Sequence, residues 1–249
     1  MGIFLHCMAS RLAVKLCSLL PAWSSESLVF LDVGMKKAFW HRPNASRQVF
    51  RQGYRMRVLH FFKTYYPDTT GGIEQVIFQL CQGGRAYDIE SQVLTISQNP
   101  YPARVQVADH LVTRAKENLN LASTGLSMRV FGQFKEMAAE ADVVHFHFPW
   151  PLMDLVHFAT AHGRPTVLSY HSDVVKQRTL LKLYGPLMGR FLRSMDRIVV
   201  ASPNYLSSSE TLTAFSDKTV VIPYGLDEMA YPKISLEKIH HLRKSVPEK

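Results

Sequence analysis

Short apolar runs and amphipathic stretches alternate along the chain from Met56 to about residue 225. The runs, among them RVLHFF, SQVLTIS, DVVHFHF and PTVLSYH, are rich in valine, leucine and isoleucine, as buried parallel strands are. The stretches between them, such as IEQVIFQLCQ and SMRVFGQFKEMAAE, carry apolar residues at helical spacing. This alternation predicts an α/β fold in which helices cover both faces of a parallel sheet.

The second half of the chain continues the pattern with several breakers. DRIVVAS and KTVVIPYG are further expected strands, and DHLVTRA, with weaker alternation, is another. Helices are expected over WPLMDLVHFATAHG, which Gly163 closes, and over PNYLSSSETLTAF, which begins near Pro203. A long helix over residues 174–194 contains Gly185-Pro186, which predicts a kink or a split.

The formal net charge of +9 is concentrated at the start of the chain. Residues 1–55 hold eight Lys/Arg and two Asp/Glu side chains, and the remaining residues hold 21 and 18. The later part is therefore nearly balanced, and without a basic stripe of interleaved aromatic residues no nucleic-acid partner is predicted. Cys7, Cys17 and Cys81 have no paired spacing, which favours free thiols in a reducing cytoplasm.

The chain divides into three segments. Residues 1–55 have no sustained period and are predicted to be a poorly structured leader, consistent with translation from upstream of the natural start. Arg11 and Lys15 interrupt the apolar run near the N-terminus, which argues against a secretory signal. Residues 56–232 are the expected domain, and residues 233–249 are expected to form a helix that leads out of it.

The ends of the expected strands are the candidate positions for a site, because ligands of parallel α/β sheets bind beyond the carboxyl ends of the strands. Gly71-Gly72 lies after the first strand and at the start of the first helix. Glycine there allows close backbone approach and positive φ, and the helix N-terminus suits a phosphate. A plain tight turn is the other interpretation, since the pair is neither a Walker loop nor a G-x-G-x-x-G fingerprint.

Histidines lie at two of the other strand ends. His145 and His147 alternate along one strand and point to the same face; no third metal ligand is evident, so no metal site is predicted. His147, nearer the strand end, is expected to face the cleft. His171 is placed to bind a sugar hydroxyl or transfer a proton, or else to fill a corner while Asp173 caps the next helix. Ser202 is expected chiefly as the N-cap of the helix that follows it.

Five motifs, HFFKTYYPDTTGGIEQ, HFHFPWPL, SYHSD, RIVVASPNYL and VIPYGLD, occur in this order. Over about residues 56–232 they resemble the N-terminal domain of a family 4 glycosyltransferase, most closely the bacterial enzymes that add mannose or rhamnose to lipopolysaccharide O-antigen. The resemblance implies a Rossmann-like domain that forms the N-terminal half of a GT-B fold. It also implies retaining transfer of a hexose from a nucleotide-sugar, such as GDP-mannose or GDP-rhamnose, to a lipid-linked or polysaccharide acceptor, without a metal or other cofactor.

The resemblance assigns donor-side roles to four residues. Gly71 and Gly72 match the turn beneath the donor diphosphate. Tyr224 and Gly225 lie at the cleft, where the chain begins to cross to the second domain.

The same resemblance supplies the sugar and acceptor side. His171 matches the histidine that contacts the transferred sugar and is the catalytic candidate. His147 matches a position that lines the acceptor pocket. Asp173 and Ser202, at strand ends nearby, complete the candidates for substrate binding.

The second domain of the GT-B fold is expected to be absent from this chain, so the chain is expected to be inactive on its own. Residues 233–249 would then be the linker helix toward that domain. One alternative is a non-catalytic module that binds an acceptor or glycan and pairs with a separate donor-binding chain. Another is a different GT-B or epimerase-like enzyme that acts on nucleotide-sugars.

A lipid-linked acceptor implies a cytoplasmic protein that works at the inner face of the cytoplasmic membrane. Basic and aromatic residues on the long helix are candidates to touch anionic headgroups. They are Lys176, Arg178, Lys182 and Tyr184. A solvated helix face is the other interpretation of the same residues.

Overall fold

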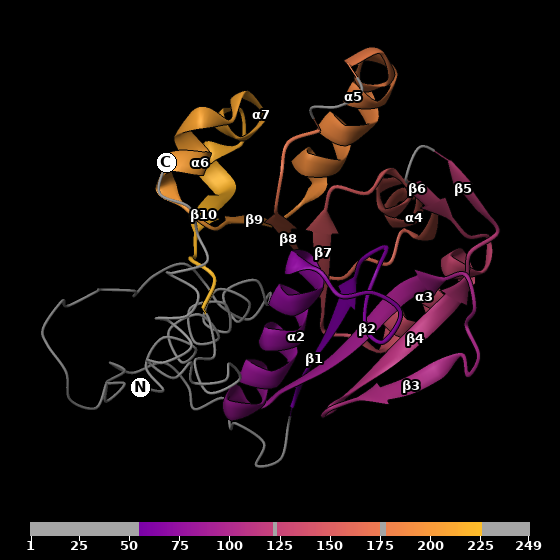
Figure 1. Ribbon diagram of the computed structural model, residues 1–249. Helices are drawn as coiled ribbons and strands as arrows, with labels where there is room; N and C mark the ends of the chain where they lie inside the picture. Colours follow the sequence, from indigo (N-terminus) through magenta and orange to yellow (C-terminus); the bar gives the residue numbers. More distant parts are fainter. Residues whose placement is uncertain (1–54, 122–123, 175–177, 226–249) are drawn as a thin grey trace, which may run out of the picture.

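The computed structural model describes residues 55–121, 124–174 and 178–225, which form one eight-stranded sheet covered by helices and a separate two-stranded hairpin (Figure 1). Eight strands are ordered β10-β9-β8-β7-β1-β2-β4-β3. Every neighbouring pair is parallel except β3 with β4. The strands are β1 (Met56–Phe61), β2 (Ile89–Ser97), β3 (Arg104–Val107), β4 (His110–Lys116), β7 (Val143–Phe148), β8 (Thr166–Tyr170), β9 (Arg197–Val200) and β10 (Thr219–Val221).

The strand order reverses between β1 and β7. From β1 the chain proceeds through β2 to β4 on one side, then returns to β7 and continues outward through β8, β9 and β10. Such a reversal opens a crevice at the carboxyl ends of the two central strands, where α/β proteins of this type bind ligands. The expected Rossmann-like α/β sheet is confirmed, and the switch point lies between β1 and β7.

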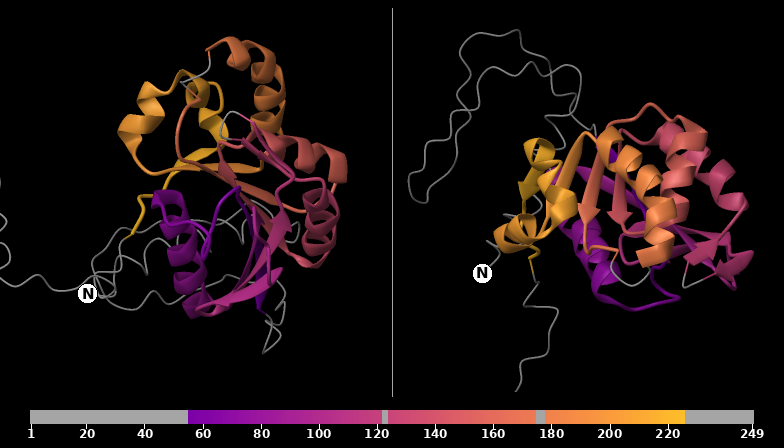
Figure 2. Two further views of the ribbon diagram at one scale, coloured as in Figure 1. Left: turned by 45° about the vertical axis from the view of Figure 1, so that its right-hand side comes forward. Right: turned by 90° about the horizontal axis from the view of Figure 1, so that it is seen from above.

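Helices cover both faces of the sheet (Figure 2). Apolar residues of α3, α4 and α5 share one core cluster with Leu59, Phe61 and Phe146 of the central strands. On the other face, α2 packs through Leu80 and Ile77. The helices are α2 (Gly72–Gly84), α3 (Arg129–Glu140), α4 (Pro151–Thr160), α5 (Arg178–Ser194), α6 (Pro203–Ser208) and α7 (Glu210–Thr213).

The strand residues that face α2 change character along the strands. Toward the amino ends they are valines of one apolar cluster, Val58, Val143 and Val167. Toward the carboxyl ends they are polar and equally buried, namely His60, His145, His147 and Ser169. Period-two alternation places both sets on the same face. The polar half of this face lies at the switch point.

The antiparallel edge strand β3 and a small hairpin of β5 (Leu119–Leu121) and β6 (Thr124–Leu126) were not expected from the sequence. They are short, and three or four residues hold too little alternation to be distinguished from loop. The expected strand over DHLVTRA is confirmed as β4.

Three helix expectations need correction. A kink or a split was expected at Gly185-Pro186; the split is wrong, because α5 runs without interruption from Arg178 to Ser194 with Pro186 inside, and the kink stays a prediction. The expected single helix from Pro203 is two short helices, because Ser209 takes an extended conformation between them. Finally, α4 ends at Thr160 rather than at Gly163, since Ala161 already has a left-handed φ of 41°.

The proposed leader, 1–55, lies outside the described residues except for its last residue. The exit helix at 233–249 lies wholly outside them. Both stay predictions.

Candidate functional site

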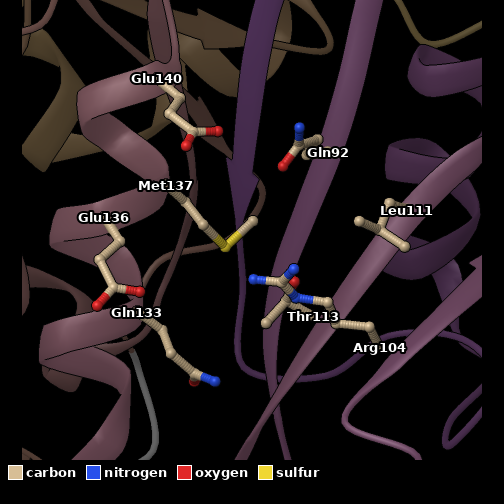
Figure 3. A pocket seen from close by; sticks show the side chains of 8 residues that line it. All are labelled: Gln92, Arg104, Leu111, Thr113, Gln133, Glu136, Met137 and Glu140. Atoms are coloured by element: carbon tan, nitrogen blue, oxygen red, sulfur yellow. The ribbon is translucent and has the colours of Figure 1, made fainter.

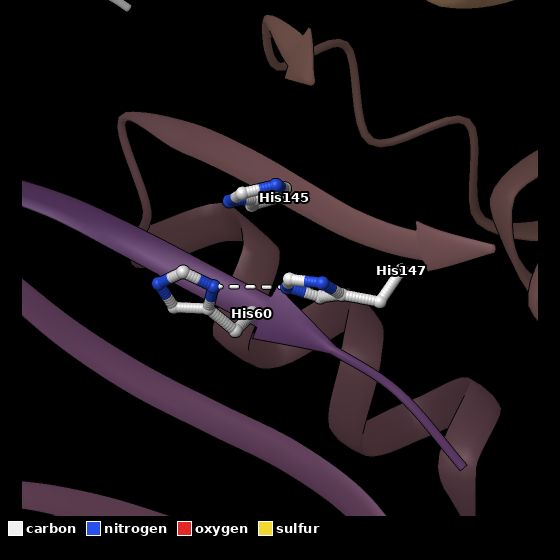
Figure 4. Close-up of side chains that lie close together, drawn as sticks. All are labelled: His60, His145 and His147. Atoms are coloured by element: carbon white, nitrogen blue, oxygen red, sulfur yellow. Dashed lines mark hydrogen bonds between the residues drawn. The ribbon is translucent and has the colours of Figure 1, made fainter. Parts of the chain in front are cut away.

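Four side chains form a continuous hydrogen-bonded row at the switch point. His60 Nδ1 of β1 lies 3.2 Å from His147 Nε2 of β7 (Figure 4), and His147 Nδ1 lies 3.1 Å from His171 Nε2 just beyond β8. The other ring nitrogen of His171, Nδ1, lies 2.8 Å from the hydroxyl of Tyr224, which follows β10. The row therefore links four strand ends that are far apart in sequence.

The row runs from the buried interior toward the surface. His60 is 2% exposed and His147 is 0% exposed, whereas His171 and Tyr224 are half-buried. The expectation that His147 faces the cleft does not fit this burial, because His171 lies over it. His171 and Tyr224 are thus the members of the row that a ligand reaches first.

Burial keeps the imidazoles of the row uncharged. Desolvation lowers the pKa of His60 to about 3 and that of His171 to about 4. It also lowers the pKa of His147 well below its usual value, with added repulsion from the neighbouring histidines. A neutral imidazole has one N–H and one bare nitrogen, so it can donate at one side and accept at the other. The row is built from such groups.

His145 lies beside the row without being part of it. Its ring stacks on His147 with centroids 4.3 Å apart, and its Nε2 is 2.9 Å from Ser169 Oγ. Its Nδ1 is buried without a hydrogen-bond partner.

Among the residues that the structure describes, His60, His145 and His147 are the one group that could hold a metal ion, with ligand atoms within 4.8 Å of one another. The third histidine, His60, was missed by the sequence argument. Two features disfavour a metal. The nitrogens of His60 and His147 already face each other at hydrogen-bond distance, and the rings of His145 and His147 are stacked rather than splayed around a common centre.

Gly71 is the N-cap of α2, and its backbone is extended with φ −160°. The positive φ considered from the sequence is therefore not what this position needs. Glycine is required at this position for lack of space, because a Cβ on Gly71 would lie 2.6 Å from Glu74 Oε2. Glu74, in the first turn, folds back and accepts a hydrogen bond from Thr69 Oγ1 at 3.0 Å. A Cβ on Gly72 would meet nothing within 4 Å, so the open side of the turn lies at Gly72.

Asp173 does not cap the next helix. Its Oδ1 accepts hydrogen bonds from Tyr170 Oη and from Ser209 Oγ, both at 2.8 Å. The carboxylate thus ties the end of β8 to the junction of α6 and α7, and Val174, which follows Asp173, is not helical. The sequence argument overlooked Ser209 because a serine within an expected helix gives no sign of a distant partner.

Ser202 and Gly225 complete the expected set. Ser202 is confirmed as the N-cap of α6, with its Oγ accepting from the backbone N–H of Tyr205 at 3.2 Å. Gly225 is buried next to Tyr224 at the end of the described chain.

The residues expected to touch a membrane are only partly described. Lys176 and the side chains of Arg178 and Lys182 lie outside the described part. Tyr184 does not reach out to solvent through its hydroxyl, which donates to Asp154 Oδ2 at 2.5 Å. In the described part of the chain, no helix is both long and apolar enough to cross a membrane.

A small pocket of about 180 Å³ lies elsewhere, between α3 and the edge strands (Figure 3). Arg104, Glu136 and Glu140 are among the residues that line it, and because α3 covers the face opposite α2, it lies on the other face of the sheet from the histidine row. Its position near the middle of β2 and β4 is not where α/β sheets bind their ligands. We assign no role to it.

A doubly wound sheet with polar side chains at its switch point defines the class of α/β proteins that bind ligands across strand ends. The sequence profile of glycosyltransferase family 4 matches residues 70–229. The chain belongs to this family.

Two curated relatives are named as a rhamnosyltransferase and a mannosyltransferase. The D-rhamnosyltransferase WbpZ of Pseudomonas aeruginosa is 57% identical over 191 residues, which are 77% of this chain and 50% of the relative. The O-antigen chain mannosyltransferase C of Escherichia coli is 47% identical over 191 residues, 77% of this chain and 51% of the relative. The chain therefore spans about half the length of the curated relatives it matches.

Solved structures support the fold. A sucrose-phosphate synthase from Thermosynechococcus elongatus superposes with a TM-score of 0.56 at 14% identity, over 78% of this chain and 53% of that one. Anabaena Alr3699/HepE, in complex with UDP-glucose, gives 0.53 at 18% identity, over 76% and 49%. At these identities the likeness establishes architecture alone.

Proposed function

We propose that the chain is the acceptor-side half of a retaining hexosyltransferase of cell-surface polysaccharide synthesis. The transferred sugar is mannose or rhamnose, the donor is a nucleotide-sugar, and the acceptor is lipid-linked or a polysaccharide. The observation that carries the proposal is the identity of 57% and 47% to relatives named as rhamnosyl- and mannosyltransferases. A donor-binding half, corresponding to the rest of those relatives, completes the enzyme.

The geometry of the site is compatible with this role. Transfer with retention, in which the leaving diphosphate accepts the acceptor proton, needs positioning and charge stabilisation rather than a protein nucleophile. His171 and Tyr224 present polar atoms at the switch point, where a sugar would lie. Gly72 leaves the start of α2 open, and a helix N-terminus there favours the donor diphosphate.

The Glu74 carboxylate, in the first turn of α2, limits where a diphosphate can bind. The Glu74 carboxylate lies over Gly71, so it competes with any anion for that helix N-terminus. The diphosphate is therefore placed on the Gly72 side of the turn. With a lipid-linked acceptor, the enzyme would work at the inner face of the cytoplasmic membrane.

The test is a chimera of this chain with the part of WbpZ that the 191-residue match does not cover. Transfer of labelled sugar from GDP-mannose and from GDP-rhamnose to lipid-linked polysaccharide primer is measured for the chimera and for the chain alone. We expect transfer by the chimera with one of the two donors and none by the chain alone. His171→Ala in the chimera should lower the rate by about 100-fold.

Two results would contradict the proposal. A folded chimera that binds GDP but transfers neither sugar argues for the non-catalytic module that only binds a glycan. Normal turnover by the chain alone would show that no second half is needed.

A further inference from the structure

The histidine row contains more polar contacts than sugar binding by His171 requires. Both ring nitrogens of His171 are already engaged, one by His147 and the other by Tyr224. Behind His147 stands His60, which is too buried to meet a ligand. The question is what two buried imidazoles do for the one at the surface.

Hydrogen bonds between neutral imidazoles constrain one another. At each contact one nitrogen must carry the proton and the other must be bare. If His147 donates to His60 through Nε2, its Nδ1 is bare and must accept from His171 Nε2. If His147 instead accepts at Nε2, its Nδ1 carries the proton and His171 Nε2 must be bare. The row has two directions, and reversing one contact reverses all of them.

Tyr224 favours one direction. A phenol hydroxyl is a good donor and a poor acceptor, since its oxygen lone pair is delocalised into the ring. It therefore donates to His171 Nδ1, which leaves the His171 proton on Nε2. The same argument places the protons of His147 and His60 on Nε2.

We propose that His60 and His147 are positioning residues that hold the proton of His171 on Nε2, so that Nδ1 faces the ligand as a bare acceptor. In this arrangement a sugar hydroxyl that replaces the Tyr224 hydroxyl must donate to His171. That the ligand is a sugar rests on the proposed function, whereas the tautomer is a property of the chain alone.

A second pair of hydrogen-bonded histidines, His157 and His162, differs from the row because its direction is fixed. In α4 and the loop that follows it, His157 Nδ1 lies 3.0 Å from His162 Nε2, and His162 Nδ1 accepts the backbone N–H of Arg164 at 3.1 Å. A backbone amide can only donate, so that pair has one permitted direction. The three hydrogen bonds of the row join imidazole nitrogens and one hydroxyl, without a backbone amide to fix their direction, so the direction is open to change at the His60 end.

The experiment is ¹⁵N NMR of the histidine side chains in the full chain, which reports whether each nitrogen carries a proton. The His171 signals are assigned by their loss in His171→Asn. In the unaltered chain we expect Nε2 of His171 to be protonated and Nδ1 to be bare. His60→Leu leaves the buried Nε2–H of His147 without an acceptor, which costs more than turning the Tyr224 hydroxyl from donor to acceptor. His147 should therefore move its proton to Nδ1, and His171 should move its own to Nδ1. The signals of the two His171 nitrogens then exchange character.

Two further variants separate the row from general disturbance of the core. His60→Asn keeps an acceptor oxygen near the position of Nδ1, so His171 should keep its proton on Nε2. Ser169→Ala removes the partner of His145, equally buried on the same face but outside the row, and should leave His171 unchanged. If His60→Leu does not fold, His60→Met, whose thioether sulfur is only a weak acceptor and whose length is closer to that of histidine, takes its place.

Three results would overturn the proposal. The first is a proton on Nδ1 of His171 in the unaltered chain. The second is an unchanged His171 in a folded His60→Leu or His60→Met chain. The third is stoichiometric zinc bound by the chain with shifts of His60 and His147 signals, since a metal would replace their hydrogen bond. None of these measurements needs sugar transfer. They therefore test the tautomer of His171 even if the proposed transferase function is wrong.

Discussion

At the scale of single residues, the two adjacent glycines before α2 have different physical roles. Gly71 faces the Glu74 carboxylate, and Gly72 faces open space. The sequence predicted the position of the pair and its closeness to the helix start. It could not separate the two, because the difference depends on how Glu74 folds back to Thr69.

This difference predicts opposite effects of alanine at the two positions. Gly71→Ala should lower the free energy of unfolding by about 1 kcal/mol, because Cβ displaces Glu74 and breaks its bond to Thr69. Gly72→Ala, at the first helical residue, should cost nothing or stabilise by up to about 1 kcal/mol. Urea unfolding of both variants measures this. Equal losses at the two positions would contradict it.

Asp154 gives a second prediction at this scale. It is 0% exposed, its Oδ1 has no hydrogen-bond partner, and desolvation raises its pKa from 3.8 to about 8, although the Tyr184 hydroxyl opposes the shift. A carboxyl whose pKa is raised on folding loses stabilising effect as the pH rises from 3.8 through 8. Asp154→Asn cannot ionise, so it should gain on the unaltered chain by at most about 1.4 kcal/mol per pH unit across that window.

The measurement is the difference in unfolding free energy between the two chains at pH 5, 6.5 and 8. Taking the difference cancels the histidines, which titrate in both. A difference that does not change with pH would show that Asp154 is ionised in the folded chain.

At the scale of elements, the junction of α6 and α7 depends on one serine. Ser209 Oγ accepts from the backbone N–H of Leu212 at 3.3 Å, which caps α7, and it donates to Asp173 at 2.8 Å. The Ser209 backbone N–H bonds the Tyr205 carbonyl at the end of α6, and its side chain starts α7 and fastens this junction to Asp173 at the end of β8.

Ser209→Ala should lower the free energy of unfolding by about 1–2 kcal/mol, because it removes a cap and leaves a carboxylate with one donor fewer. Ser202→Ala is the matched control, since Ser202 caps α6 alone. It should cost less than Ser209→Ala. If urea unfolding shows a larger loss for Ser202→Ala than for Ser209→Ala, the bond from Ser209 to Asp173 does not add to stability.

The same scale shows how far the sequence could lead. The order of the parallel strands and of the longer helices between them, and the location of His147, His171 and Tyr224 at strand ends, follow from hydrophobic period and chain order alone. His60 does not, because it stands inside an apolar run and becomes significant only when the register pairs it with His145. Register and neighbour order are tertiary facts, and a contact between His171 and Tyr224 spans 53 residues.

At the scale of the whole molecule, the buried histidines make the fold sensitive to acid. Burial lowers the pKa of several of them from 6.5 to about 4, and that of one to about 3. The first four are His110, His157, His162 and His171, and the last is His60. The unfolded chain binds these protons at a higher pH than the folded chain does. Stability is therefore full above pH 6.5 and is lost as the pH falls toward 4.

Each such histidine contributes a slope of at most about 1.4 kcal/mol per pH unit in this window. Urea unfolding at pH 8, 6.5, 5.5 and 4.5 should show a midpoint that is nearly level at first and then falls steeply. Asp154 acts in the opposite direction and is removed by working with Asp154→Asn. A midpoint that stays level between pH 6.5 and 4.5 would mean that the imidazoles are hydrated.

On the sheet face toward α2, each central strand carries valine in its first half and histidine in its second. Substitutions in the two halves are therefore limited by different requirements. At Val58, Val143 or Val167 a substitution has only to fill the same volume, and several apolar residues do so. Two positions further along β1 and β7, each replacement is tested for a nitrogen at a fixed place. A saturation library of the two strands should therefore show tolerance that drops abruptly at mid-strand, although burial is the same on both sides of the step. Such a step would locate the boundary between folding and function within a single element of secondary structure.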